Sequence, residues 1–149
     1  MVTFHLLPLT LLLSLPLPIG AQVQTAFLEN SPAILCKLLA SGRAIPVSLP
    51  EPLSLADQLS HDQACLVFAR FFAVFKTTEF TTDARLSSLP GGSSGGILKA
   101  RWSFRNERTG AQAAFRIYLY VAPFRPPPSD SGQGPWLAFR IIEIRAEKV

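Results

Sequence analysis

Two runs near the end of the chain alternate large apolar residues with polar ones, and this alternation limits the possible folds strongly. Residues 98–105 read LKARWSFR and residues 115–121 read FRIYLYV. Successive side chains of a β-strand point to opposite faces of its sheet, so a period of two predicts a strand with one buried and one wet face. We therefore expect two strands that cover a core with one face and meet solvent with the other.

A third run, residues 137–146, shows the same period with one slip. Its apolar residues are in phase at Leu137, Phe139 and Ile141, and the phase then shifts to Ile142, Ile144 and Ala146. One extra residue in a strand swaps its two faces, so the slip predicts a β-bulge at Ile141–Ile142. Residues 79–89 predict a further strand, and the glycine-rich stretch 90–96 predicts a turn. The four strands together predict a bent antiparallel meander.

Residues 60–75 give the strongest helix pattern. Ser60 with Gln63 three residues later forms a capping box. Several apolar residues then share one helical face: Ala64, Val67, Phe68, Phe71, Phe72 and Phe75. Four phenylalanines on one face need a wide apolar surface, which a curved sheet supplies. This pattern favours core packing over a cofactor site.

The first part of the domain is less regular. Residues 22–30 fit the start of a helix, and a helix is predicted from the cap Ser31 through Pro32 to Gly42. Its inward residues are Ile34, Leu35, Leu38 and Leu39. Because of its prolines, the run 44–49 is predicted as an edge strand at best, and 50–59 as a loop with at most one short paired turn. The order predicts an α+β domain, with helices packed on one face of a curved antiparallel sheet.

The first 21 residues resemble a targeting segment. Residues 6–17 are almost wholly apolar, and Gly20 and Ala21 supply the small residues of a cleavage site. We predict a signal peptide over 1–21, cleavage after Ala21, and a single mature domain over 22–149. The apolar run is short for a membrane span, so no span is expected after cleavage. An uncleaved N-terminal anchor is the alternative. Export predicts a periplasmic or extracellular location.

Two cysteines, Cys36 and Cys65, remain after export. An oxidising compartment favours a disulfide between them. The alternative is a zinc site, because His61 and Cys65 share a helical face and Cys36 could approach them. The disulfide is the simpler interpretation, so we expect no metal and no cofactor.

The charge balance excludes one class of partner. The net charge is +4, but charged residues make up only 16% of the chain. Mild basicity without a polybasic tail gives weak attraction to anionic surfaces. An exported protein with this balance is not expected to bind nucleic acid.

Three segments carry a resemblance to a known family: DQACLVFARFF at 62–72, FRIYLY at 115–120 and FRIIEIRAEK at 139–148. The chain resembles a family of short exported bacterial proteins of unknown function over residues 31–147. The matching positions are Phe115, Arg116, Ile117 and Tyr118, then Ile141, Glu143, Ile144, Arg145 and Glu147. The resemblance implies the cone-shaped α+β fold of nuclear transport factor two, also called cystatin-like. The family supplies no catalytic residues to carry over.

This chain departs from the family in two places. Only about nine residues separate the predicted cleavage site from Ser31, whereas the family has a fuller first helix. The proline-rich loop at 123–135 is also long. Both departures concern one rim of the cone.

The polar phase of the strands gives a candidate binding surface. Its residues are Arg101, Arg116, Tyr118, Tyr120, Arg140 and Arg145. Arginine and tyrosine are enriched at binding hot spots, so this face is a candidate for a protein partner or a homodimer contact. The alternative is a solvated face with cross-strand arginine–glutamate pairs, Glu143 and Glu147 among them.

The apolar phase gives a candidate pocket. Phe68, Phe72, Trp102, Phe104 and Phe115 are expected to line the cone interior, as a packed core or around a small apolar ligand. The main hypothesis is a non-enzymatic module that holds a ligand or binds a protein. The alternatives are a small-molecule enzyme with Asp83 or His61 as base, and a cell-envelope component that dimerises through its sheet.

Overall fold

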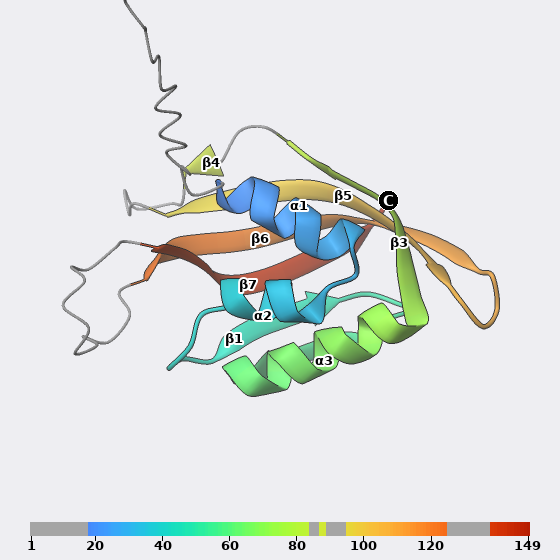
Figure 1. Ribbon diagram of the computed structural model, residues 1–149, viewed down its shortest axis with the longest axis horizontal. Helices are drawn as coiled ribbons and strands as arrows, with labels where there is room; N and C mark the ends of the chain where they lie inside the picture. Colours follow the sequence, from blue (N-terminus) through green and yellow to red (C-terminus); the bar gives the residue numbers. More distant parts are fainter. Residues whose placement is uncertain (1–17, 84–86, 89–94, 125–137) are drawn as a thin grey trace, which may run out of the picture.

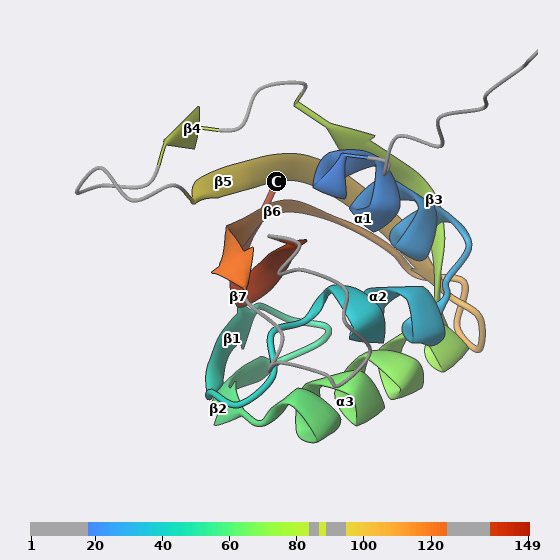
Figure 2. The ribbon, with the colours of Figure 1, turned by 60° about the vertical axis from the view of Figure 1, so that its left-hand side comes forward.

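Three helices lie along the inner side of a curved seven-stranded sheet in the computed structural model, which describes residues 18–83, 87–88, 95–124 and 138–149 (Figures 1 and 2). The helices are α1 (Ile19–Leu28), α2 (Pro32–Leu38) and α3 (His61–Val74). The strands are β1 (Ile45–Leu49), β2 (Leu55–Leu59), β3 (Phe75–Thr82), β4 (Ser87–Ser88), β5 (Gly96–Asn106), β6 (Gln112–Phe124) and β7 (Ala138–Lys148). The sheet order is β2-β1-β7-β6-β5-β3, and β4 pairs with β5. The predicted α+β class is confirmed.

The predicted meander forms the larger part of the sheet. Strands β3, β5, β6 and β7 pair in antiparallel fashion, each with the next along this series. The predicted β-bulge is confirmed, because Tyr120 pairs with Glu143 and Val121 pairs with Ile141, which leaves Ile142 without a partner in the register. Strand β3 begins at Phe75, directly after α3 and four residues before its predicted start. The predicted turn at 90–96, the predicted loop at 123–135 and Leu137 lie largely or wholly outside the described residues.

The prediction that residues 44–49 form at best an edge strand is wrong. Strand β1 lies inside the sheet, between β2 on one side and β7 on the other. Its parallel pairing with β7 covers Val47 and Ser48, so Pro46, which has no N–H to donate, falls outside that pairing. The predicted loop at 50–59 is also wrong for its second half, because Leu55–Leu59 is strand β2.

Helix α2 begins at its predicted cap but ends four residues early. The Ser31 hydroxyl accepts a hydrogen bond from the Ile34 N–H at 3.2 Å. The helix stops at Leu38 because the chain then turns to meet β7: Leu39 forms a parallel bridge with Ile141, and the Ala40 N–H donates to the Ile141 carbonyl at 2.9 Å. The backbone of Leu39 and Ala40 therefore pairs with β7 and does not continue the helix.

Helix α3 follows its prediction closely. The capping box is present, with the Gln63 N–H donating to Ser60 Oγ and the Ser60 N–H donating to the Gln63 side chain. Its inward face packs on the sheet, with Ala64, Phe68 and Phe72 buried. The side chains that were expected to alternate along β5 and β6 do so, and those in the apolar phase are buried.

Helix α1 extends to both sides of the predicted cleavage site. It begins at Ile19, whose side chain is buried, and the Ala21 N–H donates to the Pro18 carbonyl. Cleavage after Ala21 would remove Ile19 and the first turn of the helix, and the cleavage site stays a prediction. Residues 1–17 of the predicted signal peptide lie outside the described residues. None of the helices in the described ranges is long and apolar enough to cross a bilayer.

Candidate functional site

Aromatic rings fill the middle of the cone. The five residues that were predicted to line this interior, Phe68, Phe72, Trp102, Phe104 and Phe115, are each at most 1% exposed. Their rings contact one another, as in the Trp102–Phe104 pair with centroids 4.5 Å apart and the Phe104–Phe115 pair at 5.0 Å. The Trp102 indole N–H donates to Thr77 Oγ1 at 2.9 Å, so its polar atom is satisfied.

Phe27 of α1 lies at the centre of this cluster and was not predicted. Its ring contacts those of Phe68, Phe72, Phe80 and Trp102. Residues 22–30 have too little periodicity to show which side chain turns inward. The only signal was a single large aromatic residue in an otherwise weak helical stretch.

Neither candidate base lies in the cone interior. Among the described residues, no polar or charged side chain is buried. Asp83 is exposed at the end of β3, beside Lys99, Arg101 and Arg116 around a hollow of about 250 Å³. His61 lies at the start of α3 against the two cysteines. Neither Asp83 nor His61 therefore meets the packed interior.

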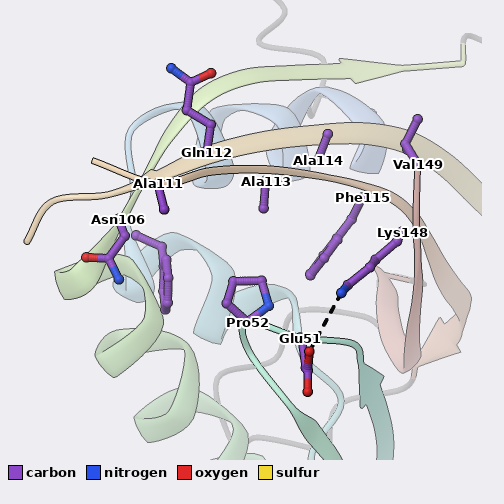
Figure 3. A pocket seen from close by; sticks show the side chains of 11 residues that line it. Glu51, Pro52, Asn106, Ala111, Gln112, Ala113, Ala114, Phe115, Lys148 and Val149 are labelled. Atoms are coloured by element: carbon purple, nitrogen blue, oxygen red, sulfur yellow. Dashed lines mark ion pairs between the residues drawn. The ribbon is translucent and has the colours of Figure 1, made fainter. Parts of the chain in front are cut away.

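A larger hollow opens at the end of the cone where β5 turns into β6 (Figure 3). We call it the hairpin hollow. It has a volume of about 490 Å³, within the range of small-molecule sites. Phe115 and Ala113 point into it from β6, while Gln112 and Ala114 point away. At its rim, Lys148 Nζ lies 3.8 Å from Glu51 Oε2.

Small side chains create the hairpin hollow. Ala113 pairs with Phe104 and continues the inward phase of Phe115, so an alanine stands where the strand otherwise carries a large residue. Phe75 and Pro52 bound the space from the end of α3 and from the β1–β2 turn. The sequence signal that could have found this hollow was the loss of bulk at position 113 within the alternating run.

The six residues predicted as a binding surface all lie on the outer face of β5, β6 and β7. Arg101 pairs with Arg116, and Tyr118 pairs with Arg145. Arg140 pairs with Ala122. Ala122 is two residues after Tyr120 on β6, so these two side chains point to the same face. Residues that pair directly across two strands share a face. The helices lie on the opposite, inner side of the sheet (Figures 1 and 2).

The charges on this outer face are unevenly balanced. Arg145 Nε lies 3.6 Å from Glu143 Oε1 along the same strand, so this pair is not the cross-strand contact that was expected. Arg116 stands opposite Glu147 on one side and opposite Arg101 on the other. Within the described ranges, no ion pair joins Arg101 or Arg116 to a carboxylate. Like charges placed directly opposite on a sheet repel each other.

The predicted disulfide between Cys36 and Cys65 is confirmed. It links α2 to α3, and His61 packs against it. His61 Nε2 lies 3.8 Å from each sulfur and 2.9 Å from the Cys36 carbonyl oxygen. His61 Nδ1 lies 3.2 Å from Asp62 Oδ1. The three residues are half-buried and bring one nitrogen and two sulfurs together.

Comparison with known proteins identifies the fold and nothing finer. No family model and no curated protein matches the chain. Among solved structures, an NTF2-like (nuclear-transport-factor-2-like) protein of unknown function in nutrient uptake from Rhodospirillum rubrum is similar over 87% of this chain and 93% of its own, with a TM-score of 0.58 and 11% identity.

Two further structures give the same result. A ketosteroid isomerase-like protein from Erwinia carotovora atroseptica matches over 88% of this chain and 92% of its own, with a TM-score of 0.58 and 12% identity. A putative isomerase from Bacillus subtilis matches over 85% of this chain and 80% of its own. Its TM-score is also 0.58 and its sequence identity is also 12%. At such low identity the likeness concerns the fold alone. The chain therefore has the NTF2-like fold, the cone-shaped α+β architecture that the family resemblance implies.

Proposed function

We propose that this protein is an exported, non-catalytic binding module whose outer sheet face recognises an acidic protein partner. The observation that carries the proposal is the pairing of Arg101 with Arg116, beside Tyr118 and Tyr120, on a face that none of the described helices covers. Export is supported by the predicted signal peptide, and the disulfide is compatible with it.

The charge of the outer face favours an acidic partner. The register places seven cations on it, Lys76, Lys99, Arg101, Arg105, Arg116, Arg140 and Arg145, against four carboxylates, Glu79, Asp83, Glu143 and Glu147. Charge complementarity steers encounter and sets specificity. A second copy of the same cationic face is a poorer match, since like charges would meet, so a homodimer through this face is the alternative to be tested.

An enzymatic role has less support. Some solved proteins with this fold carry the name isomerase, but such names describe those proteins. Here Asp83 lies on the outer side with the arginines, and His61 lies against the disulfide. A general base has to lie within hydrogen-bond reach of the proton it takes. Neither residue is positioned to act inside the cone.

The experiment that tests the proposal is a titration of the ¹⁵N-labelled mature chain with a poly-glutamate peptide carrying one tyrosine. We expect amide shifts confined to β5, β6 and β7, weakened by added salt. The double variant Arg101→Glu/Arg116→Glu should abolish them. The control variant Arg43→Glu/Arg70→Glu makes the same change of charge at exposed residues outside the sheet and should keep them.

Two outcomes would count against the acidic partner. Shifts that are scattered over the molecule, or that survive the Arg101/Arg116 reversal, would remove the outer face as the site. A native mass spectrum that shows a dimer, and only monomers for Arg116→Ala/Tyr118→Ala, would replace the acidic partner with a second copy of the chain.

The hairpin hollow supports a second candidate function, the holding of a small apolar ligand. Phe75 and Ala113, which are half-buried, supply an apolar lining that is open to solvent, and the fully buried Phe115 lies beneath them. Native mass spectrometry of the exported chain should then show a retained small molecule. Ala113→Leu, which fills the hollow, should lose it, while Ala44→Leu at an exposed position should not. A bare protein mass for the unmodified chain would contradict this second function.

A further inference from the structure

We infer that Cys36, His61 and Cys65 form a redox-gated zinc site. In this inference the chain with the disulfide holds no zinc there. The reduced chain binds one Zn²⁺ through two thiolates and Nε2 of His61. The inference rests on the α2–α3 contact and is independent of the outer sheet face and of the hairpin hollow.

The imidazole nitrogen already lies at a suitable distance from each sulfur. His61 Nε2 is 3.8 Å from Cys36 Sγ and 3.8 Å from Cys65 Sγ. Tetrahedral zinc with Zn–S near 2.3 Å and Zn–N near 2.0 Å places a nitrogen and a sulfur ligand about 3.6 Å apart. Nδ1 is also 3.8 Å from Cys65 Sγ, and Nε2 faces the Cys36 carbonyl at 2.9 Å. The imidazole is therefore within reach of both sulfurs, but it has to turn Nε2 away from that carbonyl to share a metal with them.

The backbone also holds the two sulfur atoms close. Cys36 lies on α2 and Cys65 on α3, with their Cα atoms 5.1 Å apart. His61 and Cys65 are four residues apart on α3, so they project from the same face. In a zinc site the two sulfurs would stand about 3.8 Å apart. Rotation about the Cα–Cβ bonds can supply that separation after reduction.

Asp62 is placed to orient the histidine. In the disulfide form, the Nε2–H of His61 donates to the Cys36 carbonyl at 2.9 Å. With zinc on Nε2, the ring proton moves to Nδ1, which lies 3.2 Å from Asp62 Oδ1. A carboxylate that accepts the second ring N–H is the usual support of a zinc-bound histidine. The His61 side chain is 27% exposed, which leaves room for water as the fourth ligand.

The chemistry of the switch balances with a dithiol as reductant. The dithiol gives two electrons and two protons to the Cys36–Cys65 bond and becomes a disulfide itself. Zinc then displaces the two thiol protons and binds the thiolates. A metal bridge thereby replaces the covalent bridge between α2 and α3, and the two helices stay tied in both redox states.

The test uses cobalt as a spectroscopic probe for zinc. The full mature chain is reduced with a phosphine under nitrogen and titrated with Co²⁺. We expect one equivalent to bind, with thiolate charge-transfer bands and intense tetrahedral d–d bands, and Zn²⁺ to displace it. The oxidised chain should show neither band. His61→Ala should lose the tetrahedral spectrum, and Asp62→Asn should weaken binding by about 10-fold, whereas Asp57→Asn on β2 should not.

Several results would overturn the inference. A reduced chain without the cobalt spectrum, or an unchanged spectrum in His61→Ala, would remove the site. If reduction alone unfolds the chain, circular dichroism provides the second measurement. Zinc should then restore the helical signal of the unmodified chain and not that of His61→Ala. A reduced chain that stays unfolded with zinc would equally exclude the site.

Discussion

The inner and outer faces of the same strands differ in what fixes their side chains. Along β6, Phe115, Ile117, Leu119 and Val121 are fully buried, while the residues between them are exposed or half-buried. The inner side chains are held by rings and helices on every side. None of the described helices covers the outer ones. The fold is therefore specified on one face, and the other face is free to carry recognition.

Neighbouring substitutions on β6 should give the largest contrast. Phe115→Ala removes a buried ring that contacts Trp102 and Phe104, and it should lower the free energy of unfolding by about 3–5 kcal/mol. Arg116→Ala, one residue along, should change it by less than about 0.5 kcal/mol. Urea denaturation of both variants measures the difference. Similar losses in the two variants would break the distinction between the faces.

Removing the disulfide tests whether the packing of the helices on the inner face depends on the covalent link between α2 and α3. Cys36 and Cys65 are 29 residues apart. Their bond should contribute about 3–4 kcal/mol by restricting the unfolded chain. Cys36→Ser/Cys65→Ser should lose that amount in urea, measured against the oxidised parent. A reductant should not affect the double variant further. An equal loss on reduction of both proteins would trace the effect to another cause.

The inner and outer faces could be predicted from the sequence because alternation is a local property. The phase of Leu98, Trp102 and Phe115 reports burial directly, and the slip at Ile141–Ile142 reports the bulge. Ser60 and Gln63 likewise mark the start of α3 by their own side chains. These features need no knowledge of distant parts of the chain.

The features that could not be predicted depend on distant contacts. Strand β1 lies inside the sheet because Val47 meets Ile144, almost a hundred residues later in the chain. Helix α2 ends early because Leu39 meets Ile141. The hairpin hollow exists because Pro52, Phe75 and Ala113 come together around an empty volume. A local pattern does not report which strand a segment will join or where bulk will be missing.

The two serine caps differ in the number of hydrogen bonds that they form. Ser60 caps α3 in a box with Gln63, whereas Ser31 caps α2 through the Ile34 N–H alone. Ser60→Ala should lower the free energy of unfolding by about 1 kcal/mol. Ser31→Ala should cost no more than that, and exposed Ser41→Ala should have no measurable effect. Thermal unfolding of the three variants gives the order, and a larger loss for Ser41→Ala would contradict it.

The variant Glu143→Gln tests whether the charged residues of the outer face contribute to the stability of the fold. The contact between Glu143 and Arg145 is long, and Arg145 is mostly exposed, so the pair should contribute less than about 0.5 kcal/mol. Glu143→Gln keeps the shape of the side chain and removes one negative charge from a cationic face. We therefore expect unchanged stability in urea and tighter binding of the poly-glutamate peptide at low salt, with the gain disappearing as salt is added.

The opposite result for Glu143→Gln would be equally informative. A loss of stability above 1 kcal/mol would mean that the ion pair holds β7 in place. The cations of the outer face would then be partly structural, and their excess would no longer argue for an acidic partner. Unchanged stability together with unchanged peptide binding would mean that the charge of the face does not control recognition. Only the combination of constant stability and tighter binding assigns the fold to the inner face and recognition to the outer one.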